Sequence, residues 1–230
     1  AITSVPGMAE GNQPVGDQQT SPGESTTETS QSENGTVALP SSEEESVAER
    51  FGNDPVGNGL AVVVLVAMIA SVVAVPIMVG KGLLGSMPAW LVPALAIVGI
   101  AVSFYLGSVE ASGADAVCGP VGDCNAVQQS EYASIFGIPI GILGIIGYGL
   151  LLAGWVASRA AKSTLADLGL VLAGTIALGG TLFSIYLTFL EPFVIGATCM
   201  WCLTSAVVIT GLLWSTAGPA WTAFQRLRST

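Results

Sequence analysis

The pattern of hydrophobic and polar positions divides the chain into a polar N-terminal part and a longer apolar part. Residues 1–57 are rich in Gly, Pro, Ser, Thr, Gln and Glu and show no apolar periodicity. Such a segment cannot bury enough apolar surface to offset the entropy that ordering would cost. We therefore expect residues 1–57 to form a disordered acidic tail.

Five apolar segments follow, and each is close to the roughly 20 residues that an α-helix needs to cross a hydrocarbon core about 30 Å thick. None of them carries Asp, Glu, Lys or Arg in its interior. The pattern predicts an all-α membrane protein. Its transmembrane helices are expected over residues 59–80, 88–109, 137–157, 167–190 and 202–218.

The composition agrees with a membrane protein. The mean hydropathy is +0.71, and charged residues make up 10% of the chain, whereas ordinary soluble domains carry about 25%. Ten of the 16 acidic residues lie between Glu10 and Asp54, so the net charge of −10 describes mainly the tail. The sequence has no basic, aromatic-rich patch that could neutralise phosphates, so nucleic acid is not an expected partner.

The basic residues predict the orientation in the lipid bilayer, because loops rich in Lys and Arg stay in the cytoplasm. Five of the six cationic residues fall on one side of the predicted helices. We expect that side, with a C-terminal tail over 219–230, to be cytoplasmic. The N-terminal tail and the loops over 110–136 and 191–198 are expected outside the cytoplasm. The five residues are Lys81, Arg159, Lys162, Arg226 and Arg228.

The four cysteines of the chain all fall on the predicted outer side, where disulfides persist. Cys199 and Cys202 form a Cys-x-x-Cys motif at the start of the last helix, where two thiols can close a disulfide. The helix dipole favours a thiolate there, so we expect Cys199 to be the more acidic thiol. Cys118 and Cys124 flank a turn-rich spacer that suits thiol exchange. This pattern indicates a redox site.

Two other uses of the cysteines remain open from the residues alone. The four thiols could bind a structural zinc ion, although Cys-x5-Cys is an unusual ligand spacing and the chain has no His. They could instead form permanent loop disulfides in a transporter or scaffold. The lack of His also removes the usual proton shuttle. Asp123 and Glu131 are candidate proton carriers in the outer loop.

Residues 125–136 have apolar positions at roughly helical spacing. We expect a short amphipathic helix there, lying at the interface and covering the outer end of the bundle. Pro139 follows near the first turn of the next predicted helix, where proline is well accommodated.

Several of these residues, taken in order, resemble a known family. The series consists of Cys118, Cys124, Ser130, Gly137, Ile138, Pro139, Gly144, Tyr148 and the Cys-x-x-Cys motif from Cys199 to Cys202. Over residues 90–217 it resembles the microbial branch of the vitamin K epoxide reductase family of membrane thiol oxidoreductases. The resemblance implies a four-helix catalytic domain over 88–218 around a quinone pocket. An additional helix and a short cytoplasmic loop over 58–87 would take no part in the chemistry.

The resemblance also implies roles for individual residues. Cys118 would exchange with a thioredoxin-like partner, and Cys124 would relay electrons to Cys199. Cys202 would then reduce a quinone of the ubiquinone or menaquinone type, which supports disulfide formation in exported proteins. Five residues are expected at the quinone pocket, namely Ser130, Phe136, Tyr148, Tyr186 and Met200.

The sequence departs from the family pattern in two respects. Animal members that reduce vitamin K epoxide have a Tyr one turn after the second active-site Cys, where this chain has Ala206. Quinone reduction is therefore expected, with epoxide reduction as the alternative. No thioredoxin-like domain follows the last helix, so a separate exported partner is expected. The bacterial disulfide-bond protein B family resembles the chain less, because its two cysteine pairs occur in the reverse order.

Overall fold

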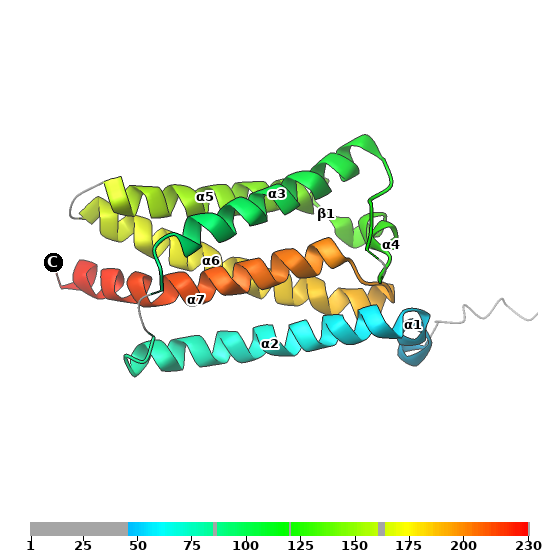
Figure 1. Ribbon diagram of the computed structural model, residues 1–230, viewed down its shortest axis with the longest axis horizontal. Helices are drawn as coiled ribbons and strands as arrows, with labels where there is room; N and C mark the ends of the chain where they lie inside the picture. The colour runs from blue at the N-terminus through cyan, green and yellow to red at the C-terminus, as the bar shows by residue number, and fades with distance from the viewer. Residues whose placement is uncertain (1–45, 85–86, 120, 161–163, 230) are drawn as a thin grey trace, which may run out of the picture. The chain divides into compact units, whose positions relative to one another are not determined.

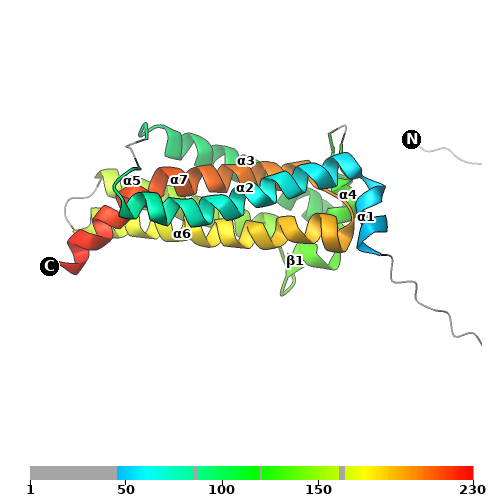
Figure 2. The same cartoon turned by 90° about the horizontal axis from the view of Figure 1, so that it is seen from below.

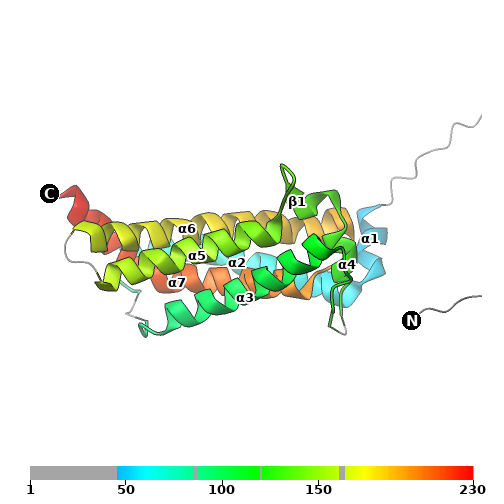
Figure 3. The same ribbon diagram turned by 90° about the horizontal axis from the view of Figure 1, so that it is seen from above.

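Five long helices run alongside one another in the computed structural model, which describes residues 46–84, 87–119, 121–160 and 164–229 (Figures 1 and 3). Each is long and apolar enough to cross a membrane. This confirms the all-α membrane fold expected from the hydropathy pattern. The helices are α2 (Pro55–Gly80), α3 (Leu91–Ser112), α5 (Ile140–Ala160), α6 (Thr164–Leu190) and α7 (Met200–Arg228).

Four of these helices form a bundle, and the fifth lies against its side. Helix α3 packs against α5 and α7, while α6 packs against the same two helices. Helix α2 lies along α6 and α7 (Figure 2). The core is filled by small and branched apolar side chains, including Ala96, Leu151, Ala177 and Leu212. The four-helix bundle with one additional helix agrees with the expected architecture.

Small residues let α3 and α5 approach each other closely. A Cβ atom on Gly141 would collide with the backbone of Gly107, and one on Gly144 would collide with the Ser103 hydroxyl. Membrane helices commonly pack through such small residues, because lipid provides no hydrophobic drive for helix association. The close contact fixes one wall of the cavity described below.

The connection between α3 and α5 covers one end of the bundle. It contains a short helix, a 3₁₀ turn and a two-stranded antiparallel hairpin. These elements lie at the end opposite the C-terminus of α7 (Figure 1). They are α4 (Cys124–Gln128), η1 (Glu131–Ala133), β1 (Ser134–Ile135) and β2 (Ile138–Pro139).

The single amphipathic helix expected over 125–136 is wrong. Helix α4 ends at Gln128, and Ser130 adopts an extended conformation before the 3₁₀ turn. Phe136 and Gly137 then form the hairpin turn with φ angles of 52° and 76°. A type I′ turn requires positive φ at both central residues, and this conformation cannot continue a helix.

Residues 46–57, which the sequence assigned to the disordered tail, are largely helical. They contain α1 (Val47–Asn53) and the start of α2 at Pro55. Asp54 caps α2 by accepting a hydrogen bond of 2.9 Å from a backbone amide in its first turn. The expected boundary at residue 57 is therefore wrong. The rest of the predicted tail, residues 1–45, lies outside the described residues.

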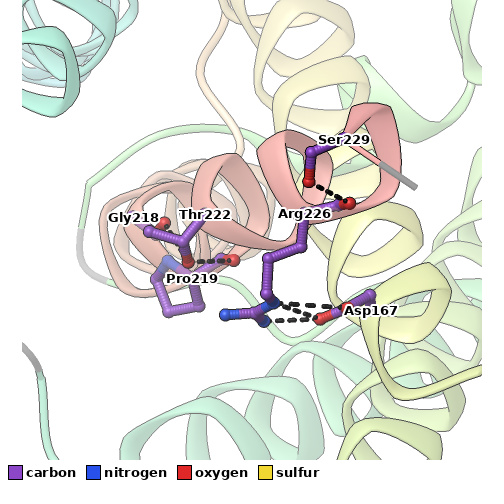
Figure 4. A network of polar contacts seen from close by, with 6 residues as sticks. All are labelled: Asp167, Gly218, Pro219, Thr222, Arg226 and Ser229. Carbon is purple, nitrogen blue, oxygen red and sulfur yellow. Dashed lines mark hydrogen bonds and ion pairs between the residues drawn. The ribbon is translucent and has the colours of Figure 1, made fainter. Parts of the chain in front are cut away.

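Helix α7 continues to Arg228, so the segment expected as a C-terminal tail from residue 219 is helical as far as it is described. Near its end, the Arg226 Nε donates a hydrogen bond of 3.0 Å to the Asp167 carboxylate (Figure 4). This pair joins the end of α7 to the first turn of α6. Exposed ion pairs contribute little to stability, so the contact mainly sets geometry.

Candidate active site

The four cysteine side chains meet at the end of the bundle covered by α4. Cys118 lies in the loop after α3, and Cys124 is the first residue of α4. Cys199 is the N-cap residue of α7, and Cys202 lies in its first turn. All four are free thiols. The structure thus brings together the four cysteines that the sequence singled out.

Side-chain contacts join the four cysteines in a row. The Cys124 thiol interacts with Cys118 on one side and with Cys199 on the other. Cys199 in turn interacts with Cys202. The two middle residues, Cys124 and Cys199, have no exposed surface, whereas the outer two are partly exposed. We refer to these four residues, in this spatial order, as the sulfur row.

The same backbone contact occurs in both cysteine pairs. The Cys124 N–H lies 3.0 Å from the Cys118 Sγ and donates to it. The Cys202 N–H donates likewise to the Cys199 Sγ at 3.3 Å. An N–H donor favours the thiolate over the thiol. Each pair therefore has a backbone group that stabilises negative charge on its first sulfur.

Burial nevertheless raises the pKa of the thiols outside the transmembrane helices. Loss of solvent contact, together with the hydrogen bond to Cys124, raises the pKa of Cys118 to about 11. The hydrogen bond with Cys199 and burial raise the pKa of Cys124. At Cys199 the hydrogen bond with Cys124 lowers the pKa, but the contact with Cys202 and burial outweigh it. The expectation of an acidic Cys199 is therefore wrong for the reduced protein.

Trp201, between the two cysteines of the motif, holds the segment that precedes Cys118. Its indole N–H donates to the Val117 carbonyl at 2.9 Å. The Val117 N–H donates to the Tyr105 hydroxyl at 2.7 Å, and the Tyr105 and Trp201 rings lie 4.8 Å apart. The first cysteine is thus fixed to α3 and α7 rather than carried on a loose loop.

The spacer between Cys118 and Cys124 packs against the residue before Cys199. Gly122 has a φ of 89°, and a Cβ atom there would collide with the Thr198 carbonyl. Only glycine combines this conformation with so close an approach at low cost. The spacer, which the sequence predicts to be flexible, therefore sets the distance between the two cysteine pairs.

Two acidic side chains that sequence reasoning missed lie beside the sulfur row. The Glu191 side chain is 2% exposed and accepts a hydrogen bond of 3.2 Å from the Cys199 N–H. Glu110 accepts from the Gly141 N–H at 3.4 Å and interacts electrostatically with Cys202. Each residue directly follows a predicted transmembrane segment in the sequence. This position on the cysteine side of the bundle is the signal that could have identified them.

The acidic residues considered from the sequence have other positions. Asp123 caps α4 by accepting hydrogen bonds from two backbone amides at 3.0 and 3.1 Å. Glu131 lies in the 3₁₀ turn and is exposed. Neither residue lines the cavities next to Cys202.

Two cavities lie at the Cys202 end of the sulfur row. Cys202 and Glu191 line both of them. The larger cavity, of about 140 Å³, lies between α3, α5, α6 and α7. Its walls are mainly apolar and include Leu106, Phe183 and Tyr148. The smaller cavity, of about 50 Å³, extends under α4 and η1. An apolar ring would therefore be accommodated better in the larger cavity.

The structure places the five residues expected at a quinone pocket in different environments. Tyr148 lines the larger cavity, where its hydroxyl lies 2.8 Å from that of Ser205. Ser130 lines the smaller cavity. The other three line neither of these cavities. Phe136 is fully exposed at the hairpin turn, Tyr186 is 52% exposed on α6, and Met200 lies against the Cys118–Cys124 spacer.

The structural zinc site considered from the sequence gains no support. Within residues 46–229, apart from the positions that the structure leaves undescribed, no group of three His, Cys, Asp or Glu residues is arranged to hold a metal ion.

Comparison with known proteins concerns the same part of the chain. The chain is 28% identical over 110 residues to the thiol-disulfide oxidoreductase LTO1 of Arabidopsis thaliana. The match covers 44% of this chain, and the chain spans only 28% of the length of that relative. A model of the vitamin K epoxide reductase family matches residues 90–217, which include the whole sulfur row and are more than half of the sequence. The chain therefore belongs to the vitamin K epoxide reductase family.

Proposed function

We propose that the protein is a membrane thiol–disulfide oxidoreductase that passes electrons along the sulfur row to a quinone. This activity would support disulfide formation in exported proteins. The observation that carries the proposal is the position of the row, which begins at partly exposed Cys118 and ends at Cys202 beside an apolar cavity. Membership of the family and similarity to a plant thiol-disulfide oxidoreductase support a redox function.

Electrons would enter from the dithiol of a thioredoxin-like partner. A partner thiolate attacks Cys118 within a Cys118–Cys124 disulfide, and Cys124 leaves as the thiolate. The second partner thiol then attacks the mixed disulfide and releases Cys118. The partner departs as a disulfide, and both cysteines of the first pair are reduced by two electrons in total.

The second step moves those electrons between the two pairs. Cys124 attacks Cys199 within a Cys199–Cys202 disulfide, and Cys202 leaves as the thiolate. Cys118 then attacks Cys124 in the mixed disulfide and releases Cys199. The contact between the Cys124 and Cys199 side chains supports this order, because it joins sulfurs of different pairs. Permanent loop disulfides in a transporter or scaffold would not need such a contact.

The residues around the larger cavity fit a quinone ring. Its walls are mainly apolar, Cys202 lies at its edge, and the buried Glu191 carboxyl provides a polar group. A quinone of the ubiquinone or menaquinone type would supply an acceptor for two electrons and two protons. Cys199 and Cys202 lose two electrons and two protons when they close their disulfide. Glu191 is placed to hold one of these protons on a carboxyl oxygen next to the pair.

Quinone is proposed as the oxidant in preference to an epoxide substrate. Ala206 occupies the position where epoxide-reducing relatives are expected to have a tyrosine, and it is 1% exposed. It therefore contributes no hydroxyl group to the cavity. The Tyr148 and Ser205 hydroxyls, two of those that line the cavity, bond to each other.

We also propose that the sulfur row faces the extracytoplasmic side. Four cationic residues that the structure describes lie at or near the helix ends opposite α4, as Figure 1 shows for the ends of α2, α5 and α7. The positive-inside rule assigns that end to the cytoplasm. The four residues are Lys81, Arg159, Arg226 and Arg228.

The test is anaerobic stopped-flow absorbance of the reduced protein mixed with a soluble ubiquinone or menaquinone analogue. The wild-type protein is expected to reduce the analogue rapidly. Cys202→Ala is expected to abolish this reaction, because Cys202 is the cysteine that lines the cavity proposed for the quinone. Equal rates for the two proteins would refute Cys202 as the residue from which electrons leave.

Cys118→Ala provides the matched control. When its Cys199–Cys202 pair has been reduced chemically beforehand, this variant is expected to react with the quinone analogue at the wild-type rate. It should fail only in turnover with a dithiol protein as the electron donor. Loss of the direct quinone reaction in Cys118→Ala would contradict the assigned order of the sulfurs.

A further inference from the structure

We propose that Asn58, together with α1 and the start of α2, positions Cys199 for exchange with Cys124. These helices lie outside residues 90–217, where the family model matches, and the resemblance implied no part in the chemistry for residues 58–87. The inference rests on the proposed function, because it concerns the transfer of electrons between the two cysteine pairs. Its test uses neither quinone nor partner.

Asn58 is a fully buried polar residue in the second turn of an otherwise apolar helix. Its amide nitrogen donates to the carbonyls of Arg50, Phe51 and Gly196 at 3.2 to 3.4 Å. Its side-chain oxygen accepts from the Thr198 hydroxyl at 2.9 Å. A buried amide without partners would destabilise the fold, so this set of bonds fixes the side chain firmly. Asn58 thus joins α1 to the segment before α7.

Thr198 connects Asn58 to both cysteine pairs. It directly precedes Cys199, and neither residue has any exposed surface. Its hydroxyl is held by Asn58, and its carbonyl packs against Gly122 of the Cys118–Cys124 spacer. Movement of Thr198 would therefore change the approach of Cys199 to Cys124.

A second contact from α1 holds the same segment. The Arg50 guanidinium donates to the Val194 carbonyl at 3.2 Å. Gly196 has a φ of 76°, and a Cβ atom there would lie 2.9 Å from the Arg50 Cβ. The Gly196 N–H also donates to the Glu191 carbonyl at 2.8 Å. Helix α1 thereby holds the segment from Glu191 to Cys199, which begins with the π-helix η2 (Glu191–Ile195).

The test measures how readily Cys199 meets Cys124. In the Cys118→Ser/Cys202→Ser background, only these two thiols remain, and glutathione disulfide can oxidise them to one disulfide with release of two reduced glutathione molecules. The equilibrium constant in a glutathione buffer, read by thiol alkylation and mass spectrometry, reports the effective concentration of one thiol at the other. This quantity depends on local geometry and is not changed by a uniform loss of stability.

Thr198→Val is expected to lower this equilibrium constant about five- to tenfold, the change that corresponds to one lost buried hydrogen bond. Asn58→Leu, which also removes the bonds to three backbone carbonyls, is expected to lower it at least as much. The double variant should be close to Asn58→Leu alone, because that change already removes the contact with Thr198. Thr198→Ser keeps the hydroxyl and is expected to restore the wild-type value. Thr175→Val on α6, whose hydroxyl bonds only to its own helix in the described structure, serves as the matched control.

The proposal is overturned if Thr198→Val and Thr198→Ser give the same equilibrium constant as the parent. If Asn58→Leu does not fold, the comparison of the two Thr198 variants decides the question alone. Failure of the proposed function would be seen separately, as absence of quinone reduction by the wild-type protein. Either result can therefore be obtained without the other.

Discussion

At the scale of single residues, Glu191 connects the sulfur row to the cavity. Its carboxylate receives the Cys199 N–H, and its side chain lines both cavities that Cys202 borders. The chain has no histidine, so a buried carboxyl is well suited to move protons when the second cysteine pair changes its redox state. The hydrogen bond to Cys199 also keeps this carboxyl next to the reacting sulfurs.

Glu191→Gln is expected to slow quinone reduction by about a hundredfold, the lower range of general acid–base contributions. The amide can still accept the Cys199 N–H bond, so the fold and the thiol content should not change. The rate is measured by anaerobic stopped flow, with circular dichroism as the check on folding. Glu131→Gln, an exposed carboxyl in the 3₁₀ turn, is the control. A wild-type rate in Glu191→Gln would exclude it as a proton carrier.

The sequence predicted the four cysteines of the site but not their surroundings. Cysteine spacing is visible in a sequence, and two pairs on one predicted side indicated a common site. The acidity expected for Cys199 was wrong, because the dipole argument neglects the contact with Cys202 and burial by neighbouring segments, which raise the pKa of Cys199. Glu191 was overlooked because a charged residue beside a proline at the end of an apolar segment also fits an ordinary loop.

At the scale of elements, the Cys118–Cys124 spacer determines how the first pair meets the second. Gly122 is the contact point, since its positive φ and its approach to the Thr198 carbonyl both require a residue without a side chain. Trp201 holds the same loop at its other end through the Val117 carbonyl. The loop is therefore held at Val117 by Trp201 and at Gly122 by Thr198.

Gly122→Ala is expected to slow electron transfer from the first cysteine pair to the second by at least about tenfold, because the added methyl pushes the spacer away from Thr198. Direct quinone reduction by a prereduced Cys199–Cys202 pair should be unaffected. Rapid acid quenching and alkylation measure the transfer step. Gly113→Ala is the matched control, because Gly113 also has a positive φ but has no atom within 4 Å of an added Cβ. Similar transfer rates in the two variants would contradict the role of the contact.

The long helices were predictable from hydropathy, whereas the short elements were not. Each of the five spans could be read from its apolar length, because lipid selects for that property directly. The hairpin depends on the left-handed conformation of Phe136, a residue type that gives no turn signal. Helix α1 depends on contacts such as the bond from Arg50 to Val194, which joins positions 144 residues apart. The pattern of neighbouring residues in a sequence carries no information about contacts between residues so far apart.

At the scale of the whole described molecule, the redox end and the basic end are separated by the length of the bundle. The 24 residues from Cys202 to Arg226 on α7 correspond to about 36 Å of helix, which exceeds the roughly 30 Å of the hydrocarbon core. The two ends must therefore contact different aqueous compartments. This separation makes the orientation directly measurable.

Single-cysteine variants are expected to react with a membrane-impermeant maleimide from opposite sides. A protein that retains only Cys118 should be labelled on intact spheroplasts. A protein in which all four cysteines are replaced by serine and Ser229→Cys is added should be labelled only after permeabilisation. The reverse pattern would place the sulfur row in the cytoplasm and would contradict the proposed supply of disulfides to exported proteins.

The linear order of the four sulfurs has a consequence for the half-reduced protein. With one disulfide among four cysteines, neighbouring sulfurs offer three positions for the bond, namely Cys118–Cys124, Cys124–Cys199 and Cys199–Cys202. Each exchange moves the bond by one sulfur, so the half-reduced protein is an equilibrium of three isomers. Their relative populations define a free-energy gradient along the row. The half-reduced protein then accumulates in the isomer that the fold stabilises most.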